Sequence, residues 1–366
     1  MPDPRISKLA KVMVHYSLKI QSGHQVFLQT TPLADELSLA FIEEATKAGA
    51  HLLIQNAVPG AREVMLKHAS NEQLDFLMPV QKTVFETFDA RMVIEALSNT
   101  RELAGIDPKR MARIQKANAP VFKTFIERVA SGDMRWCLTV YPTAAMAQEA
   151  NMSLSDYREF VYAAGMLNED DPVAFWKAEA ARQKVLIDWL AGRKDAVIKG
   201  ENVDLAMSIE GRKFISCAGH ENFPDGEIFT SPVEDSVNGW IRFKYPAIFA
   251  GQEIEDIELW FENGKVVNEK AGKNQELLTA QLNIDEGARY LGEWGIGTNY
   301  GITNFTKNML FDEKIGGTIH LAVGLGIPEA GGKNKSGTHW DMLCDMANSE
   351  VTLDGDLFYK DGKTVI

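Results

Sequence analysis

The chain has 366 residues, of which 45% are hydrophobic and 24% are charged. These values are ordinary for a globular protein with a sizeable core, and the length is sufficient for two domains. The net charge of −13 would repel the phosphates of nucleic acids and of anionic membrane surfaces, so we expect neither as a partner.

The three cysteines, Cys137, Cys217 and Cys344, are far apart in the chain and odd in number. They predict no disulfide framework and no cysteine-type zinc site, and reduced thiols are typical of the cytoplasm. The N-terminal stretch is too charged for a signal peptide, and no apolar run approaches the ~20 residues of a membrane span. We therefore expect a cytoplasmic protein with no membrane attachment.

The first half of the chain alternates predicted strands with predicted helices. Apolar residues at helical spacing predict helices, and short apolar runs predict strands. The helices are expected at residues 4–20, 34–48, 63–68, 72–78 and 109–130, and the strands at 26–30, 51–56, 90–96 and 135–141. This alternation predicts an open α/β sheet. No Gly-x-Gly-x-x-Gly motif follows these strands, so a dinucleotide site is not supported.

The pattern changes after an amphipathic helix that we expect at residues 170–193. Short strands separated by glycines follow, with Asn263-Gly264 as a hairpin signal and a short helix at 273–283. We therefore expect an α/β protein of two domains. An open α/β sheet domain would cover residues 1–195, and a β-rich α+β metal-binding domain would cover residues 196–366.

The glycine-rich stretch from Phe311 to Met346 holds the residues best suited to bind a metal. His320 lies in it, followed by the triplet His339-Trp340-Asp341. On a strand, alternate side chains share a face, so His339 and Asp341 would point to one side and Trp340 to the other. A His-x-Asp pair also occurs by chance, so this pattern alone is compatible with a metal site or with ordinary structure.

Two carboxylates upstream could complete such a site. Glu227 follows a turn that contains Pro224 and Gly226, and Glu293 lies inside an apolar, glycine-rich run. A lone buried carboxylate is very costly, so Glu293 must be paired, protonated or bound to a cation. Taken singly, Glu227 also fits a solvated turn acid and Glu293 a paired core acid. The remaining imidazole of this half, His220, lacks a partnered spacing and suggests a surface or supporting role.

Four blocks in this half, spanning residues 226–342, resemble the aminopeptidase T/aminopeptidase S family of metalloaminopeptidases. They read GEIFTSP, RYLGEWGIGTN, FDEKIGGTIHLAVG and GGKNKSGTHWDM, in this order. The resemblance implies two divalent metal ions (Zn, Co, Mn or Mg) that are held by two Glu, two His and one Asp. Carried over by position, these ligands are Glu227, Glu293, His320, His339 and Asp341.

The resemblance also implies the activity: release of N-terminal amino acids from peptides by a metal-activated water. The substrate would be a peptide with a free N-terminus, and the protein would be a homodimer. Because its apolar setting would raise its pKa, we expect Glu293 to be the catalytic residue that accepts the proton of the water. Glu227 would then bridge the two ions.

One position departs from the family pattern. The family carries a tyrosine seven residues after the first of its two His ligands, and that position is Ile327 here. The family tyrosine is thought to assist catalysis, so its loss affects the expected rate or reaction type. A nearby phenol such as Tyr300 is a candidate substitute.

Two other functions remain open from the sequence. His320, His339 and Asp341 alone satisfy the two-His-one-carboxylate pattern of a mononuclear Fe(II) enzyme, such as a ring-cleaving dioxygenase. A non-catalytic metal-binding relative is the second alternative. The presence of both Glu227 and Glu293 favours the aminopeptidase, because a mononuclear site does not need them.

Overall fold

The structure, a computed structural model, describes residues 3–249 and 251–366. Contacts between residues divide the chain into two compact units, which are described separately here. Unit 1 consists of Met1–Val173 and Gly219–Pro224, and unit 2 of Ala174–Ala218 and Asp225–Ile366.

Unit 2 begins within the helix α9 (Pro172–Leu190), and nearly all of this helix belongs to it. Its residues Leu186 and Leu190 are buried in the hydrophobic core of that unit, which explains the assignment. That residues 1–195 and 196–366 are separate folding domains stays a prediction.

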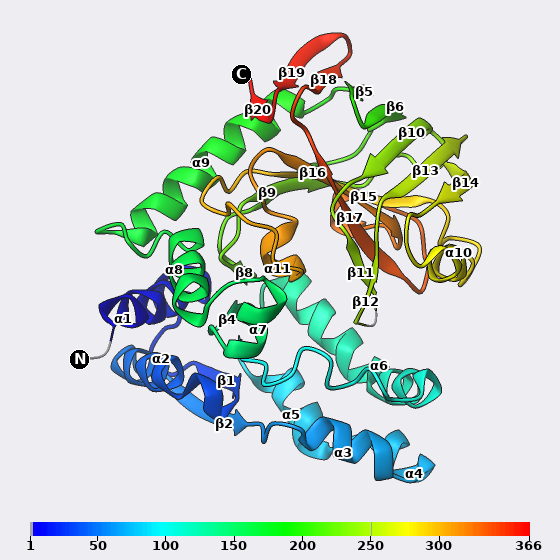
Figure 1. Cartoon of the computed structure of the whole chain (residues 1–366). Helices are drawn as coiled ribbons and strands as arrows, with labels where there is room; N and C mark the ends of the chain where they lie inside the picture. The colour runs from blue at the N-terminus through cyan, green and yellow to red at the C-terminus, as the bar shows by residue number, and fades with distance from the viewer. Residues whose placement is uncertain (1–2, 250) are drawn as a thin grey trace. The chain divides into compact units, whose positions relative to one another are not determined.

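Unit 1 is built on a parallel sheet with the strand order β2-β1-β3-β4-β8. Its first four strands confirm the predicted ones, and the fifth is added by the short return of the chain into this unit (Figure 1). The strands are β1 (Gln25–Thr30), β2 (His51–Asn56), β3 (Ala90–Glu95), β4 (Arg135–Val140) and β8 (Asn222–Phe223).

The helices of unit 1 connect these strands, as a parallel sheet requires. The helix that we expected over residues 4–20 is α-helical only in its first part and continues as a π-helical turn at Val12–Ser17. The α-helices are α1 (Pro4–Lys11), α2 (Asp35–Lys47), α3 (Ala61–His68), α4 (Asn71–Asp75), α5 (Pro79–Thr87), α6 (Pro108–Ser131), α7 (Ala144–Glu149) and α8 (Leu154–Ala164).

Unit 2 contains an eight-stranded antiparallel sheet with the order β14-β13-β10-β6-β5-β18-β19-β20 (Figure 1). Its strands confirm the β-rich second half that the glycine-separated pattern predicted. They are β5 (Asp195–Gly200), β6 (Val203–Ser208), β10 (Asn238–Phe243), β13 (Ile257–Glu262), β14 (Lys265–Lys270), β18 (Glu350–Leu353), β19 (Asp356–Lys360) and β20 (Lys363–Thr364).

A second antiparallel sheet of unit 2, called the five-stranded sheet below, has the order β17-β16-β15-β9-β7. Two small helices and a two-stranded ribbon complete the unit: α10 (Gln275–Leu282), α11 (Met309–Asp312), β11 (Ala247–Phe249) and β12 (Gln252–Ile254). The strands of the five-stranded sheet are β7 (Ile215–Cys217), β9 (Glu227–Thr230), β15 (Leu291–Gly297), β16 (Thr318–Gly324) and β17 (His339–Asp345).

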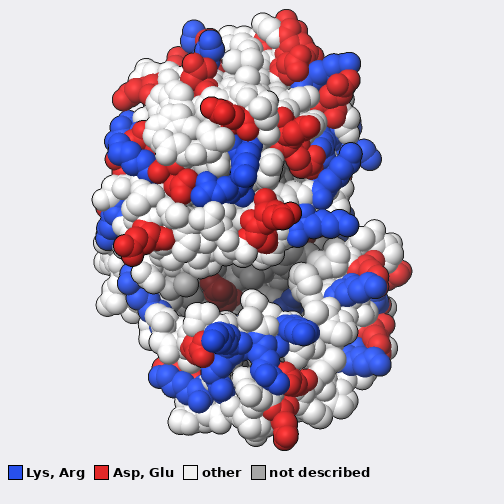
Figure 2. All heavy atoms as spheres, turned by 90° about the vertical axis from the view of Figure 1, so that its right-hand side faces the viewer, with Lys and Arg blue, Asp and Glu red and all other residues white. Residues whose placement is uncertain are grey.

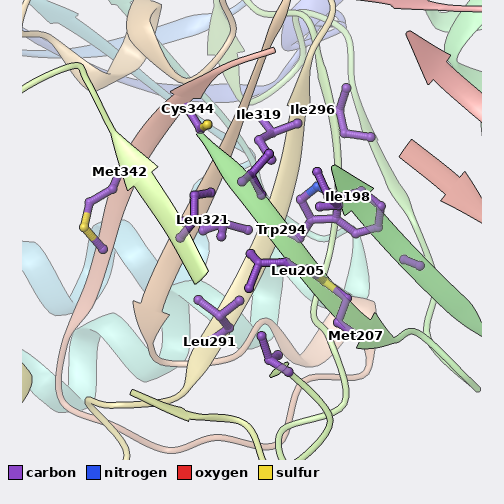
Figure 3. Close-up of a cluster of buried hydrophobic side chains, with 14 of the residues drawn as sticks. Ile198, Leu205, Met207, Leu291, Trp294, Ile296, Ile319, Leu321, Met342 and Cys344 are labelled. Atoms are coloured by element: carbon purple, nitrogen blue, oxygen red, sulfur yellow. The ribbon is translucent and has the colours of Figure 1, made fainter. Parts of the chain in front are cut away.

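One face of the five-stranded sheet forms part of the core of unit 2. Side chains at alternate positions of β15, β16 and β17 gather there with residues of β5 and β6 from the eight-stranded sheet (Figure 3). The labelled members include Trp294, Ile319, Leu321, Met342 and Ile198. Because successive side chains of a strand point to opposite faces, this packing directs the residues between them to the other face of the sheet.

The surface carries charges of both signs. Figure 2 shows Lys and Arg side chains intermingled with Asp and Glu over the face that it presents, so the excess acid is not gathered in a single patch there. Within the described residues, no helix combines the length and the apolar character needed to cross a membrane.

Candidate metal centre

The five-stranded sheet brings all five predicted ligands to its second face. His339 and Asp341 share this face and Trp340 is buried on the opposite one, which confirms the alternation expected from the triplet. In the antiparallel register Asp341 lies opposite Ala322, two residues from His320 on the same face. Glu293 on β15 and Glu227 at the start of β9 lie on the neighbouring strands.

The side chains meet around Glu293. Its Oε1 lies 3.2 Å from Nε2 of His320, and its Oε2 lies 3.2 Å from Nε2 of His339. Nε2 of His320 is also 3.5 Å from Oε2 of Glu227, and Nε2 of His339 is 3.7 Å from Oδ1 of Asp341. We call Glu227 and His320 the inner half of the site and His339 and Asp341 the outer half, with Glu293 between them.

Each half, together with Glu293, forms a group of three side chains that could hold one metal ion. Glu227, Glu293 and His320 each offer one ligand atom within 4.8 Å of the others, and Glu293, His339 and Asp341 do the same. Glu293 is therefore common to both groups. Carboxylate oxygens and imidazole nitrogens are donors that zinc and other divalent first-row metals accept.

Both imidazoles are oriented by backbone carbonyls. Nδ1 of His320 donates to the carbonyl oxygen of Glu313 at 3.0 Å, and Nδ1 of His339 donates to that of Leu325 at 2.8 Å. A carbonyl only accepts, so Nδ1 carries the proton in each ring. Nε2 of each ring is thereby directed into the site, and this is the arrangement in which a histidine binds a metal through Nε2.

The inner half is deeply buried, and burial together with the neighbouring charged groups shifts the pKa values of its side chains. Burial raises the pKa of Glu227 to about 8. For His320, burial alone would lower the pKa, but the hydrogen bond to Glu293 and the nearby Glu227 carboxylate raise it to about 10. Burial likewise favours the protonated form of Glu293, but hydrogen bonds from His320 and His339 outweigh it and lower its pKa to about 2.

The outer half is more open to solvent. The side chain of His339 is 26% exposed and that of Asp341 is 14% exposed, against 1% for His320. Burial raises the pKa of Asp341 to about 6, and the hydrogen bond with Glu293 overcomes burial to raise the pKa of His339 to about 9. Without a metal, the positive charges of the two protonated imidazoles therefore balance negative charges of the carboxylates. A bound cation would supply positive charge in place of these protons.

A glycine lies under the inner imidazole. Gly295 pairs with His320 across β15 and β16, and a Cβ on Gly295 would lie 1.9 Å from Cε1 of the His320 ring. No real Cβ contact is that short, so any larger residue would displace the ring. The absence of a side chain at Gly295 therefore leaves the space that the His320 ring occupies. Gly295 is part of the block RYLGEWGIGTN, but the sequence alone did not show why a glycine is needed there.

The structure also places further polar residues beside the inner half. Lys314 is fully buried, and its Nζ lies 3.6 Å from Oε1 of Glu227. Burial would lower its pKa, but Glu227, Glu313 and Asp225 hold it well above the usual value. Cys217 lies opposite Glu227 in the register of β7 and β9. The sequence gave no sign that Cys217 and Asp225 would lie near Glu227.

Other residues considered from the sequence are engaged elsewhere. The hydroxyl of Tyr300 donates to the carbonyl oxygen of Gly362 at 2.9 Å. His220 belongs to unit 1, where its ring stacks on Tyr16. The backbone N–H of Ile327 donates to the hydroxyl of Ser231 at 2.9 Å, which holds the loop after β16 in place.

Comparisons with known proteins identify the family of the chain. The sequence model of a family described as thermophilic metalloprotease (M29) matches residues 2–364. Aminopeptidase T of Thermus thermophilus is 26% identical, over 98% of this chain and 95% of that protein. The resemblance to the aminopeptidase T/aminopeptidase S family that the four blocks suggested is thereby confirmed.

Solved structures agree on the fold. Wild-type AmpT from Thermus thermophilus superimposes with a TM-score of 0.85 at 24% identity, covering 99% of both chains. The 2,5-dihydroxypyridine dioxygenase from Pseudomonas putida KT2440 shares the fold with a TM-score of 0.61 at 15% identity, covering 98% of this chain and 96% of that one. The fold alone thus accommodates two chemistries, and the sequence match decides between them: the chain belongs to the M29 family of thermophilic metalloproteases.

Proposed function

We propose that the protein is a metal-dependent aminopeptidase that removes N-terminal amino acids from peptides through a water activated by two divalent ions. The observation that carries this proposal is the position of Glu293, which offers one oxygen to each of the two ligand groups. A carboxylate shared in this way is typical of a bridging ligand between two ions. Membership of the M29 family supports both the metal and the peptide substrate.

The residues of the site fit a pair of ions. Oε2 of Glu227 is buried, makes no hydrogen bond and faces the inner group, as an oxygen reserved for a cation would. Three carboxylates and two imidazoles suit zinc, cobalt or manganese, and magnesium less well, because magnesium prefers oxygen donors and keeps its waters. We propose that Glu227 and His320 hold one ion, that His339 and Asp341 hold the other, and that Glu293 binds both.

The bound ions would polarise the scissile carbonyl, lower the pKa of a water and stabilise the developing oxyanion. The protein contributes orientation. Glu313 and Leu325 fix the two imidazoles through their carbonyl oxygens, and the alternation of β17 presents His339 and Asp341 side by side.

The roles that we expected for the two glutamates change in one respect. From the sequence, Glu227 was to bridge the ions and Glu293 was to accept the proton of the water. The geometry favours Glu293 as the bridge and Glu227 as a ligand of the inner ion only. The raised pKa that we expected for Glu293 is wrong, because hydrogen bonds from His320 and His339 lower it to about 2. Glu293 stays our predicted catalytic proton acceptor, a role that requires one of its oxygens to be released from an ion.

The mononuclear iron alternative is less well supported. It needs only His320, His339 and Asp341, yet the nearest partners of the two imidazoles are the oxygens of Glu293, and the Glu227 carboxylate approaches His320 as well. A dioxygenase with the same fold matches at only 15% identity, which establishes the fold and no more.

Metal analysis combined with a panel of aminoacyl p-nitroanilides tests the proposal. We expect two divalent ions per chain and hydrolysis of free-amine substrates with Zn²⁺, Co²⁺ or Mn²⁺ under anaerobic conditions. H339A and D341A should lose most of their bound metal and activity while they keep the fold, and H68A, at an exposed position of α3, is the matched control. Failure of every metal to support hydrolysis, together with Fe(II)-dependent oxygen uptake on an aromatic substrate, would refute the assignment.

We also propose that the protein is a homodimer that associates through unit 1. Strand β2 is an edge of the parallel sheet, and this strand and the segment after it expose several large apolar side chains. Such an edge and such a patch favour association with another chain. The exposed residues include Leu53, Ile54, Val58, Val64, Met65, Phe76, Met78 and Val80. Light scattering should give twice the mass of one chain, and the M65E/F76E variant should give a single chain.

A cytoplasmic location is the last part of the proposal. Cys137, Cys217 and Cys344 all lie in the described part of the chain, and no disulfide joins them. Cell fractionation with an antibody against the protein tests this directly.

A further inference from the structure

Lys314 is an unusual residue because its whole side chain is buried beside the inner half of the site. Lysine is almost never fully buried unless it is paired, since an uncompensated charge in the interior is very costly. Here Nζ forms a close ion pair with the carboxylate of Glu313 and lies 3.6 Å from Oε1 of Glu227. Nζ of Lys314 therefore lies within a cluster of acids.

Lys314 lies near only one of the two carboxylate oxygens of Glu227. Oε1 faces Lys314, whereas Oε2 faces Nε2 of His320 at 3.5 Å and makes no hydrogen bond. Lys314 thus leaves Glu227 a single oxygen for the inner ion.

The same glutamate belongs to a third group with the chemistry of a metal site. Cys217, Asp225 and Glu227 offer a thiol sulfur and two carboxylate oxygens that all lie within 4.8 Å of one another. Asp225 and Glu227 are buried, and Asp225 also acts electrostatically on Lys314. Three side chains of suitable type are therefore assembled around Glu227, and Nζ of Lys314 lies 3.6 Å from one of them, Glu227.

We propose that Lys314 is a positioning residue, and that its ammonium supplies the positive charge that a third metal ion would otherwise supply beside Glu227. It holds Glu227 in its one-oxygen orientation and prevents the Cys217–Asp225–Glu227 group from binding a metal. At an effective dielectric constant of about 20, repulsion between an ammonium and a divalent ion about 5 Å apart lowers affinity by roughly 10⁵-fold. The inner ion would bind the other oxygen of Glu227, Oε2, on the side that faces His320. This inference rests on the proposed two-ion function.

Cobalt reconstitution tests the inference, because a thiolate bound to Co²⁺ adds a charge-transfer absorption in the near ultraviolet. Metal-free wild type with excess Co²⁺ should bind two ions per chain without this band. K314A, which removes the charge and opens space, should bind a third ion and show the band. The double variant K314A/C217S should lack the band, and K314R, which keeps the charge, should behave as wild type.

Two results would overturn the inference: a third ion or a thiolate band in the wild type, or a folded K314A that binds two ions without the band. Removing the ammonium leaves Glu227 and Glu313 without their cation, so circular dichroism must first show that K314A is folded. If it is not, K314Q provides a neutral, longer and polar replacement, for which the same third ion and the same band are expected. A wild type that binds no divalent ion contradicts the proposed function instead.

Discussion

The inner and outer halves of the site use similar ligands in different surroundings. Glu227 and His320 are buried and lie beside a lysine, whereas His339 and Asp341 are partly exposed and form no ion pair with a lysine or arginine of the described residues. Each imidazole is nonetheless oriented in the same way, by a hydrogen bond from Nδ1 to a backbone carbonyl. The inner half is therefore part of the interior, and the outer half is the side of the site that solvent reaches.

The largest expected effect comes from the residue that the two halves share. E293Q keeps the shape of the side chain but removes the charge that both ligand groups use. We expect the loss of both ions and a fall in kcat on the order of 10³-fold or more, as for a residue on which a whole catalytic unit depends. Metal analysis and kcat on an aminoacyl p-nitroanilide measure this. E262Q, at an exposed position of β13, is the matched control. Retention of one full equivalent of metal by E293Q would show that the halves are independent.

The two imidazoles should differ in their contribution to stability. H320A leaves Glu227 and Glu293 buried without a partner, and removing one member of a buried pair costs about 3 kcal/mol or more. H339A affects a partly exposed position, where water replaces the lost contact, so we expect a cost of about 1 kcal/mol. Denaturant unfolding of the metal-free proteins gives both values. Equal losses would mean that burial does not distinguish the halves.

The glycine beneath the inner imidazole gives a selective test of that half. In G295A the new Cβ would overlap the His320 ring, so the ring must move away from its metal-binding position. Residues that orient a ligand typically contribute 10–100-fold to metal affinity, and we expect a loss of this order for one ion only. Calorimetric titration with Zn²⁺ measures it. G105A, where a Cβ meets no neighbour, serves as the control, and unchanged binding of both ions by G295A would contradict the account.

We expect the smallest effect from a substitution of Ile327, near the outer half of the site. Ile327 stands where the family has a tyrosine, two residues after Leu325, whose carbonyl orients His339. A phenol there could donate to the developing oxyanion, and loss of one such donor costs on the order of 10²–10³ in rate. I327Y should recover part of this, roughly 10-fold in kcat with little change in KM. I327F is the control, because its ring cannot donate, and an equal gain from both variants would exclude the hydrogen bond.

The sequence predicted the strands of the parallel sheet well because each is a short apolar run bounded by turns. It also predicted the shared face of His339 and Asp341, since that depends only on the period of a strand. It did not reveal that Glu293 lies between the imidazoles, because this depends on the register of β15 against β16. Register is set by packing and turns over the whole sheet, and for the same reason the proximity of Cys217 to Glu227 was not visible.

The two faces of the five-stranded sheet have a consequence for which substitutions the sheet tolerates. The residues that face the core and the candidate ligands alternate along the same strands, so the candidate ligands can be varied while the apolar side chains of the other face stay in place. A substitution among the candidate ligands therefore acts on the chemistry of one face and leaves the residues that hold the two sheets of unit 2 together unchanged.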